Sequence, residues 1–338
     1  MHMADALISP AVGGTMWAAS AVTIAYCSRR VRRESDDSTI PLMGVLGAFI
    51  FAAQMINFTI PVTGSSGHLG GGLLLAILLG PFAAFLTIAS VLMVQALFFA
   101  DGGLLALGCN IFNLGFFPAF LAYPLFYKRI IGQQPSAQKI MIASCAASIA
   151  GLQMGSFAVV LETVSSGISS LPFPAFLALM QPIHLAIGIV EGLVTASVVS
   201  FVYTARPDVM HCALKDRPTP IHPLRNILLS FLVVAVMTAG IVSWFASKDP
   251  DGLEWAVTRV AGRMGLKGPE QGLHATLANL QKRSAILPGY SFRNPAETQQ
   301  EDLINRIGTS LAGVVGGLFT LGLALLIGFV VKRRSKTA

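Results

Sequence analysis

Charged residues are scarce in this chain. Asp, Glu, Lys and Arg make up 12% of its 338 residues, hydrophobic residues make up 54%, and the mean hydropathy is +0.69. Ordinary soluble domains carry about twice that charged fraction, so the composition favours a membrane protein. The formal net charge is +7, but the Lys and Arg residues lie between apolar runs. This placement argues against nucleic acid as a partner.

Sequence signals of catalysis are also missing. The four cysteines have no paired spacing, so they indicate neither a disulfide framework nor a zinc ribbon. No G-x-x-x-x-G-K-[ST] segment occurs, and no Ser-His-Asp or Cys-His arrangement stands out. A membrane enzyme acting on lipids would call for acidic clusters, and the run around Glu34, Asp36 and Asp37 has the character of a solvated loop. We therefore expect no enzyme, and any ATP hydrolysis would come from separate subunits.

Apolar runs of about 20 residues, each long enough to cross a bilayer, recur along the chain. They cover approximately residues 8–27, 40–58, 69–99, 104–127, 140–161, 176–203, 227–245 and 307–331. The run 69–99 is too long for one crossing and too short for two, so we expect a short helix over 69–79, a break at Gly80-Pro81, and a full helix from Phe82. The predicted fold is an all-α polytopic membrane protein. It has a core of about seven segments and a two-helix C-terminal unit with an extracytoplasmic loop.

The basic residues predict the orientation of these segments. Most Lys and Arg residues lie in the stretches 29–33, 128–139, 206–225 and 332–336, whereas the connections 61–67, 100–103 and 162–174 contain none. Cytoplasmic loops of membrane proteins are enriched in Lys and Arg. We therefore expect the N-terminus outside and the C-terminus inside.

The start of the chain offers nitrogen ligands to a metal ion. The α-amine of Met1, the amide nitrogen of His2 and the imidazole of His2 can close fused five- and six-membered chelate rings on one ion. A fourth nitrogen would complete the planar N4 geometry that suits Ni(II) or Cu(II). This chelate requires a free Met1 amine, and the first residues lack the basic region of a cleaved signal peptide.

His68 is the candidate for the fourth nitrogen. It lies in the glycine-rich run 64–72, on the same predicted side of the membrane as the N-terminus. Glycine permits close backbone approach, and non-helical backbone at membrane depth is tolerated where it lines a cavity. Taken without the Met1-His2 pair, His68 would more simply cap a helix.

Further polar residues are candidates to support this site. Partners of a ligating imidazole normally orient it, and the candidates near the outer face, which could equally satisfy helix ends, are Gln54, Asn57, Thr63, Ser65 and Ser66. Ionisable groups at membrane depth are functional candidates by default. His184 and Glu191 lie about two helical turns apart on one face and could bind the metal, line the cavity or contact a partner.

The first apolar segment carries two small-xxx-small pairs. Gly14 with Ala18, and Ala21 with Ala25, would permit close approach of another helix. The pairs are equally compatible with docking of a partner subunit and with packing inside this chain.

Four segments carry a resemblance to a known family. They are the Met1-His2 start, the segment FAAQMINF at 51–58, the run 64–72 around His68, and the segment PDGLEW at 250–255. The chain resembles the M-type substrate-binding subunits of nickel and cobalt energy-coupling-factor transporters, the CbiM/NikM family. The PDGLEW segment resembles the opening of the extracytoplasmic part of the N-type accessory subunit, here joined to the M-type unit in one chain.

The resemblance implies a division into domains. Residues 1–205 would form the M-type membrane core with the metal site, and 206–225 a cytoplasmic linker. Residues 226–338 would form the N-type unit, with an extracytoplasmic segment at about 246–306 between two transmembrane helices. The chain departs from the family's Asp-Gly pair near the start, since it reads Asp5-Ala6, which leaves the path of the N-terminal loop open.

The resemblance also implies a function and partners. Met1, His2 and His68 would hold Ni(II) or Co(II) as the transported substrate, without a cofactor of the protein's own. A T-type coupling membrane subunit and two cytoplasmic ATPase subunits would complete the transporter in a bacterial or archaeal cytoplasmic membrane, surrounded by lipid. Deprotonation of a backbone amide is easier for Ni(II) than for Co(II), which favours nickel. Cobalt uptake for cobalamin biosynthesis and, more distantly, vitamin binding are the alternatives.

Overall fold

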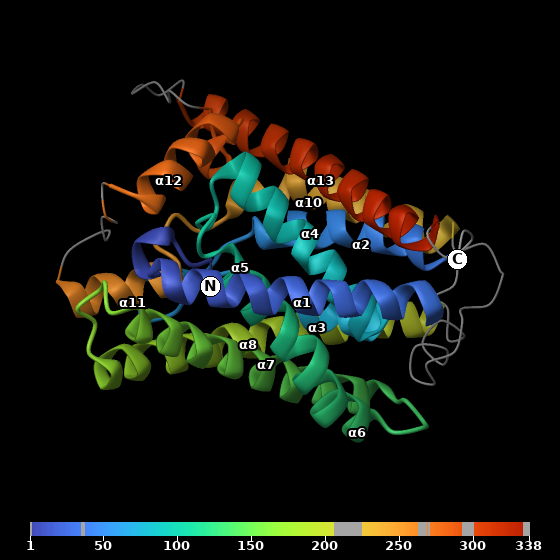
Figure 1. Cartoon of the computed structure of the whole chain (residues 1–338). Helices are drawn as coiled ribbons and strands as arrows, with labels where there is room; N and C mark the ends of the chain where they lie inside the picture. The colour runs from blue at the N-terminus through green and yellow to red at the C-terminus, as the bar shows by residue number, and fades with distance from the viewer. Residues whose placement is uncertain are drawn as a thin grey trace.

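The computed structural model describes residues 2–34, 38–205, 225–262, 269, 271–292 and 301–333. Helices dominate these residues, and most of them run along a common axis (Figure 1). Met1 and most of the expected linker 206–225 lie outside the described residues. Within them, the described part of the C-terminal unit begins with α10, at Arg225.

The membrane core begins with α1 (Pro10–Glu34) and α2 (Thr39–Gln54). A short antiparallel hairpin of β1 (Phe58–Ile60) and β2 (Ser65–Gly67) follows. The hairpin was not expected from the sequence, because each strand has only three residues and β2 reads Ser-Ser-Gly. Strand β2 ends at Gly67, so the hairpin positions the residue that follows it, His68.

The predicted break at Gly80-Pro81 is confirmed. Helix α3 (Gly72–Leu79) ends at Gly80, whose φ of 78° lies in the left-handed region that glycine tolerates, and α4 (Pro81–Phe99) starts with proline in its first turn. Proline suits this position because its missing N–H would be unpaired in a first turn anyway. The short helix α3 starts at Gly72, three residues later than expected, since residues 68–71 are not helical and Gly71 has a left-handed φ of 75°.

The rest of the core consists of three long helical segments. Helix α5 (Leu107–Ile111) continues through wide π-helical turns over Phe112–Tyr127, which contain Pro118 and Pro124, into α6 (Lys128–Ile131). Prolines in a helix interior remove backbone donors, and wide turns accommodate their rings. Helices α7 (Ala137–Ser166) and α8 (Phe173–Ala205) then pack against each other along their length.

The C-terminal unit is built into the same bundle. It comprises α10 (Arg225–Gly240), α11 (Gly252–Ala261), α12 (Leu273–Ser284) and α13 (Glu301–Arg333). Helix α13 lies against α2, where a Cβ atom added at Gly316 would overlap the ring of Phe51 and one at Gly44 would meet Leu325. Small residues allow such close helix contacts in membranes, so the two units share one packed interior.

Length and hydropathy confirm a multi-pass membrane protein. Within the described ranges, five helical segments are long and apolar enough to cross a bilayer, namely 81–99, 107–131, 137–166, 173–205 and 304–332. Helices α2 and α10 are apolar but shorter. With α1 and α3, these segments correspond to the nine that the sequence predicts.

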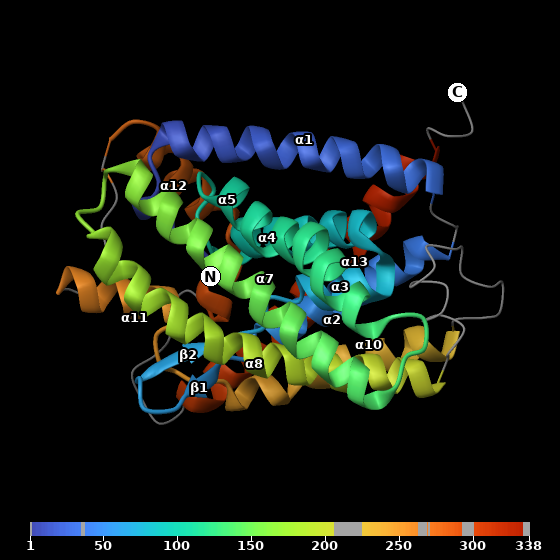
Figure 2. The same ribbon diagram turned by 90° about the horizontal axis from the view of Figure 1, so that it is seen from below.

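The two ends of the bundle differ in character. The hairpin, α11, α12 and the start of α1 lie at one end, on the left in Figures 1 and 2. The C-terminal ends of α1 and α13, together with α6, lie at the other end. The Lys and Arg of these three segments therefore gather opposite the hairpin.

Candidate metal centre

The N-terminal segment is bound inside the hairpin end of the bundle. The N–H of Met3 donates to Asn110 Oδ1 at 2.8 Å, and the Met3 carbonyl accepts from the Gly103 N–H at 2.8 Å. The side chains of Met3, Leu7 and Ile8 are buried. These contacts fix the residue that directly follows His2.

Asp5 gives this segment a second anchor. Its Oδ1 accepts the N–H of Ala106 at 3.0 Å, just before α5 begins. A Cβ atom at Gly103 would overlap the Asp5 carboxyl group, so the close approach requires glycine there. Ala6 lies in a short 3₁₀ turn, Asp5–Leu7, and is not among the described residues with positive φ. The Asp5-Ala6 departure therefore leaves the local path unstrained.

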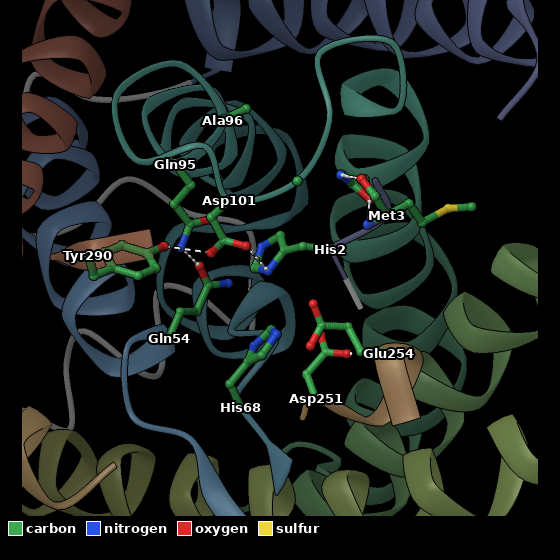
Figure 3. A network of polar contacts seen from close by, with 12 residues as sticks. His2, Met3, Gln54, His68, Gln95, Ala96, Asp101, Asp251, Glu254 and Tyr290 are labelled. Atoms are coloured by element: carbon green, nitrogen blue, oxygen red, sulfur yellow. Dashed lines mark hydrogen bonds and ion pairs between the residues drawn. The ribbon is translucent and has the colours of Figure 1, made fainter. Parts of the chain in front are cut away.

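The imidazole rings of His2 and His68 lie face to face. Their centroids are 4.8 Å apart and their planes differ by 14°. The His2 side chain is 6% exposed and His68 is 8% exposed. Figure 3 shows the two rings between the end of α4 and the start of α11. Residues from the chain start and from the hairpin thus meet in one buried place.

Burial keeps both rings neutral. Desolvation lowers the pKa of His2, although the nearby Asp101 carboxylate opposes this effect. Desolvation also lowers the pKa of His68, to about 3. Burial has this direction because it penalises the charged form of an imidazole. A neutral imidazole has the free lone pair that a metal ion requires.

The polar surroundings of His2 are uneven. Nδ1 lies 3.4 Å from Asp101 Oδ1, whereas Nε2 is buried without a hydrogen-bond partner among the described residues. Asp101 also accepts a hydrogen bond from Tyr290, at 2.6 Å from the hydroxyl to Oδ2 (Figure 3). One ring nitrogen of His2 therefore lies beside a carboxylate, while the other is buried without such a partner.

Side-chain ligands alone do not account for a metal site here. Among the described residues, no group of three or more His, Cys, Asp or Glu side chains has a metal-binding arrangement. The predicted set contains only two such side chains, since its other two nitrogens belong to the backbone of His2 and to Met1. The Met1 part of that prediction lies outside the described residues.

Gln54 links the surroundings of the two histidines. Its Nε2 donates to the carbonyl of Gly70 at 2.8 Å, two residues after His68. Its Oε1 accepts from Gln95 Nε2 at 2.9 Å, on the α4 side of the site. Of the five supporting candidates, Gln54 therefore has the most direct connection to the imidazole pair.

The other four supporting candidates lie on the hairpin or just before it. Thr63 Oγ1 and Ser65 Oγ are 2.7 Å apart within its turn. Ser66 Oγ donates to the Asp249 carbonyl at 2.8 Å, and the Asn57 carbonyl accepts from the Ser247 N–H at 2.7 Å. These contacts shape the hairpin and join it to the C-terminal unit, rather than orient the imidazoles directly.

Glu191 and His184 have different surroundings on α8. The Glu191 carboxylate accepts the N–H groups of Gly70 and Gly71, at 2.7 and 3.2 Å, and so holds the glycine-rich run after His68. His184 donates from Nδ1 to the Met180 carbonyl at 2.8 Å. It lines a cavity of about 10 Å³ that His68 and Asp251 also line.

Several residues near the site were missed by the sequence reasoning. Asp101 lies in the connection 100–103, which was noted only for its lack of Lys and Arg, and Asn110 lies within the apolar run 104–127. Asp251 belongs to the PDGLEW segment and caps α11 by accepting the Glu254 N–H at 2.8 Å. Tyr290 lies 189 residues from Asp101 in the sequence, so no local signal connects the two.

The small residues of α1 divide between two faces. Gly14, Ala18, Ala21 and Ala25 are exposed, and an added Cβ atom at Gly14 would meet nothing within 4 Å. Gly13 instead faces Leu105, which a Cβ atom there would crowd. The outer stripe is therefore available to another helix, while the inner face packs within this chain.

The fold and the buried imidazole pair define a multi-pass membrane protein with a candidate site for a transition-metal ion. The chain belongs to the family described as the cobalt uptake substrate-specific transmembrane region, which matches residues 2–209. A second family, the PDGLE domain, matches residues 225–333. Both matches agree with the resemblance to an M-type unit fused to an N-type unit.

Relatives with the same fused arrangement are known. The chain is 31% identical to a putative fused nickel transport protein of Archaeoglobus fulgidus, over 100% of both chains. It is 30% identical to a fused nickel transport protein of Rhodobacter capsulatus, over 97% of both chains. It is also 30% identical to a cobalt transport protein of Sorangium cellulosum, over 62% of this chain and 94% of that protein.

A solved structure shares the fold of the membrane core. The crystal structure of a transition metal transporter superposes with a TM-score of 0.54 and 28% identity, covering 62% of this chain and 96% of that chain. The prediction of an all-α polytopic fold is thus confirmed.

Proposed function

We propose that this protein captures Ni(II) or Co(II) for uptake, as the substrate-binding membrane subunit of an energy-coupling-factor transporter. The observation that carries the proposal is the stacked, buried and neutral pair of His2 and His68. The full-length similarity to fused nickel transport proteins supports it. Transport, not catalysis, is the role proposed for the chain.

The metal ligands in this proposal are the Met1 amine, the amide and ring nitrogens of His2, and the His68 imidazole. Chelate rings that include a deprotonated backbone amide favour Ni(II) over Co(II), in line with the general affinity order. We therefore propose nickel as the preferred substrate. Cobalt uptake for cobalamin biosynthesis is the second candidate, supported by the similarity to cobalt transport proteins.

The proposed membrane arrangement follows the distribution of Lys and Arg. The N-terminus, the hairpin and the metal site face the outside of a cytoplasmic membrane, and the basic end faces the cytoplasm. No nucleotide-binding motif occurs in the sequence, so we propose that a T-type membrane subunit and two ATPase subunits supply the energy. The outer stripe of Gly14, Ala18, Ala21 and Ala25 is the proposed contact for the membrane subunit.

The C-terminal unit has a proposed role in metal loading. His274 Nε2 on α12 lies 2.9 Å from the carbonyl of Ile8, which ends the N-terminal segment. Gln281 donates to the carbonyl of Ala96, in α4, at 2.9 Å and to that of Gly102, on the loop that holds Met3, at 2.6 Å. These contacts support a role for α12 in holding or releasing the N-terminal segment.

The experiment that tests the function is a metal titration. Purified, metal-free protein with a confirmed free Met1 amine is titrated with Ni(II) and Co(II), beside the variant His2→Ala. We expect tight Ni(II) binding with the visible band of a planar N4 complex, and loss of that band in His2→Ala.

Each other outcome of the titration has a definite meaning. Equal or stronger binding of Co(II) would identify cobalt, rather than nickel, as the preferred substrate. Absence of binding of either ion by the intact protein would contradict the proposed function and favour an organic substrate, such as a vitamin.

A further inference from the structure

We propose that Tyr290 and Asp101 are positioning residues that orient the His2 imidazole for metal binding. The inference rests on the proposed function and adds a specific contribution of the C-terminal unit to the metal site. Tyr290 lies in that unit and Asp101 lies directly after α4. Together with His2 they form a chain of polar contacts, Tyr290 to Asp101 to His2.

The first step is the support of Asp101. The Tyr290 hydroxyl donates to Oδ2 at 2.6 Å, which leaves Oδ1 to face His2. The backbone N–H of Asp101 donates to the Gln95 carbonyl at 3.1 Å, and Ala100 before it has a left-handed φ of 53°. Both ends of the residue are therefore held, so the carboxylate cannot simply turn away from the ring.

The second step is the placement of Tyr290. Its ring stacks on Phe99, with centroids 5.2 Å apart and planes 17° apart, and contacts Phe51 edge-on at 6.2 Å. Its backbone φ is 60°, which is uncommon for a residue with a side chain. Strained backbone of this kind persists where the surroundings determine it and clusters at functional sites. This packing places the Tyr290 hydroxyl within hydrogen-bond distance of Asp101.

The third step is what a ligating imidazole needs. A histidine that binds a metal through one nitrogen normally donates the N–H of its other nitrogen to a carboxylate, a carbonyl or water, which fixes the orientation of the ring. Asp101 is the carboxylate beside His2 (Figure 3). A six-membered chelate ring that starts from the His2 amide must use Nδ1, so Nε2 is the nitrogen that must donate.

The structure places the other ring nitrogen, Nδ1, on the side of Asp101. Nδ1 faces Asp101 at 3.4 Å, a separation too long for a strong hydrogen bond. A half-turn about the Cβ–Cγ bond exchanges the positions of Nδ1 and Cδ2, and those of Cε1 and Nε2. Nε2 then lies next to the position that Nδ1 occupied, near Asp101. In the turned orientation Nδ1 can bind the metal, and we infer that Asp101 then accepts the Nε2–H.

The test compares Tyr290→Phe with Ser284→Ala. Each variant removes one hydroxyl that joins the C-terminal unit to the region at the end of α4, since Ser284 Oγ donates to the Leu97 carbonyl at 2.7 Å. Of these two hydroxyl groups, that of Tyr290 bonds to Asp101, whereas that of Ser284 does not. We expect the dissociation constant for Ni(II) to rise about tenfold in Tyr290→Phe, within the range typical of losing such a partner, with a shifted visible band. Ser284→Ala should stay within about twofold of the unsubstituted protein and keep its band.

A double-variant comparison separates positioning from general loosening. Asp101→Asn should weaken Ni(II) binding by about tenfold or more, and adding Tyr290→Phe to it should bring little further loss, because Tyr290 acts through Asp101. Equal affinity and an unshifted band in Tyr290→Phe, or full additivity in the double variant, would overturn the proposal. Failure of the unsubstituted protein to bind Ni(II) or Co(II) would instead contradict the proposed function.

Discussion

At the scale of single residues, the centre depends on imidazoles that stay neutral in a buried place. The pKa of His68 is about 3, against an ordinary value of 6.5, because burial disfavours its charged form. An unfolded chain protonates this histidine near pH 6.5, whereas the folded chain does so only near pH 3. Between these values the unfolded state binds more protons, and stability therefore rises with pH.

This pKa shift predicts acid sensitivity of the metal-free protein. Between pH 6.5 and 5.0 the free energy of unfolding should fall by about 2 kcal/mol through His68, at ~1.4 kcal/mol per pH unit. His68→Gln removes this contribution and should show a clearly smaller loss over the same range. Thermal unfolding in detergent at the two pH values measures the difference. Parallel losses in both proteins would mean that His68 is not the group responsible.

At the scale of elements, the sequence predicts what depends on local chemistry. The helix break at Gly80-Pro81 could be predicted because glycine and proline have local conformational preferences, and the long apolar runs predict the spans by hydropathy alone. The hairpin could not, because Phe58–Ile60 and Ser65–Gly67 are too short to show an alternating pattern. The Asp101–Tyr290 contact could not either, since it joins residues far apart in sequence.

The candidate site likewise contains residues that the sequence predicts and residues that it does not. His2 and His68 were singled out because their nitrogens suit one chelate, and the structure brings their rings to 4.8 Å. The partners of these rings were mostly missed. Asn57, Thr63, Ser65 and Ser66 were chosen for nearness along the chain. Asp101, which lies beside His2, instead approaches from the connection that follows α4. Packing between elements decides such partners.

The outer stripe on α1 makes a prediction at this scale. Ala18→Leu places a bulky side chain on the exposed stripe and should prevent close approach of a partner helix. We expect Ni(II) binding by the purified protein to be unchanged, while recovery of the assembled transporter and nickel uptake fall severalfold. Ala178→Leu, at an exposed position on α8, is the matched control. Loss of assembly in both variants, or in neither, would argue against docking at this stripe.

At the scale of the whole molecule, the two fused units share one interior. Helix α13 packs on α2, and α12 holds both the N-terminal segment and the loop after α4. The hairpin in turn pairs with the start of the PDGLEW segment, where the Ser66 N–H donates to the Pro250 carbonyl at 2.8 Å. Elements of the C-terminal unit thus contact the hairpin, the N-terminal segment and the loop after α4, which surround the imidazole pair. We therefore expect a unit in that position to influence how fast the site opens.

This arrangement predicts a kinetic role for α12. The double variant His274→Ala/Gln281→Ala removes the side-chain contacts of α12 with the N-terminal segment and its loop. The variant removes three hydrogen bonds of roughly 1 kcal/mol each, so we expect Ni(II) to enter and leave about a hundredfold faster. The dissociation constant should change little, because none of these contacts involves a proposed metal ligand. Stopped-flow measurement of both rates, with Ser284→Ala as a single-contact control, tests the prediction. Unchanged rates would mean that the N-terminal segment opens independently of α12, and a large loss of affinity would mean that α12 shapes the metal-bound state itself.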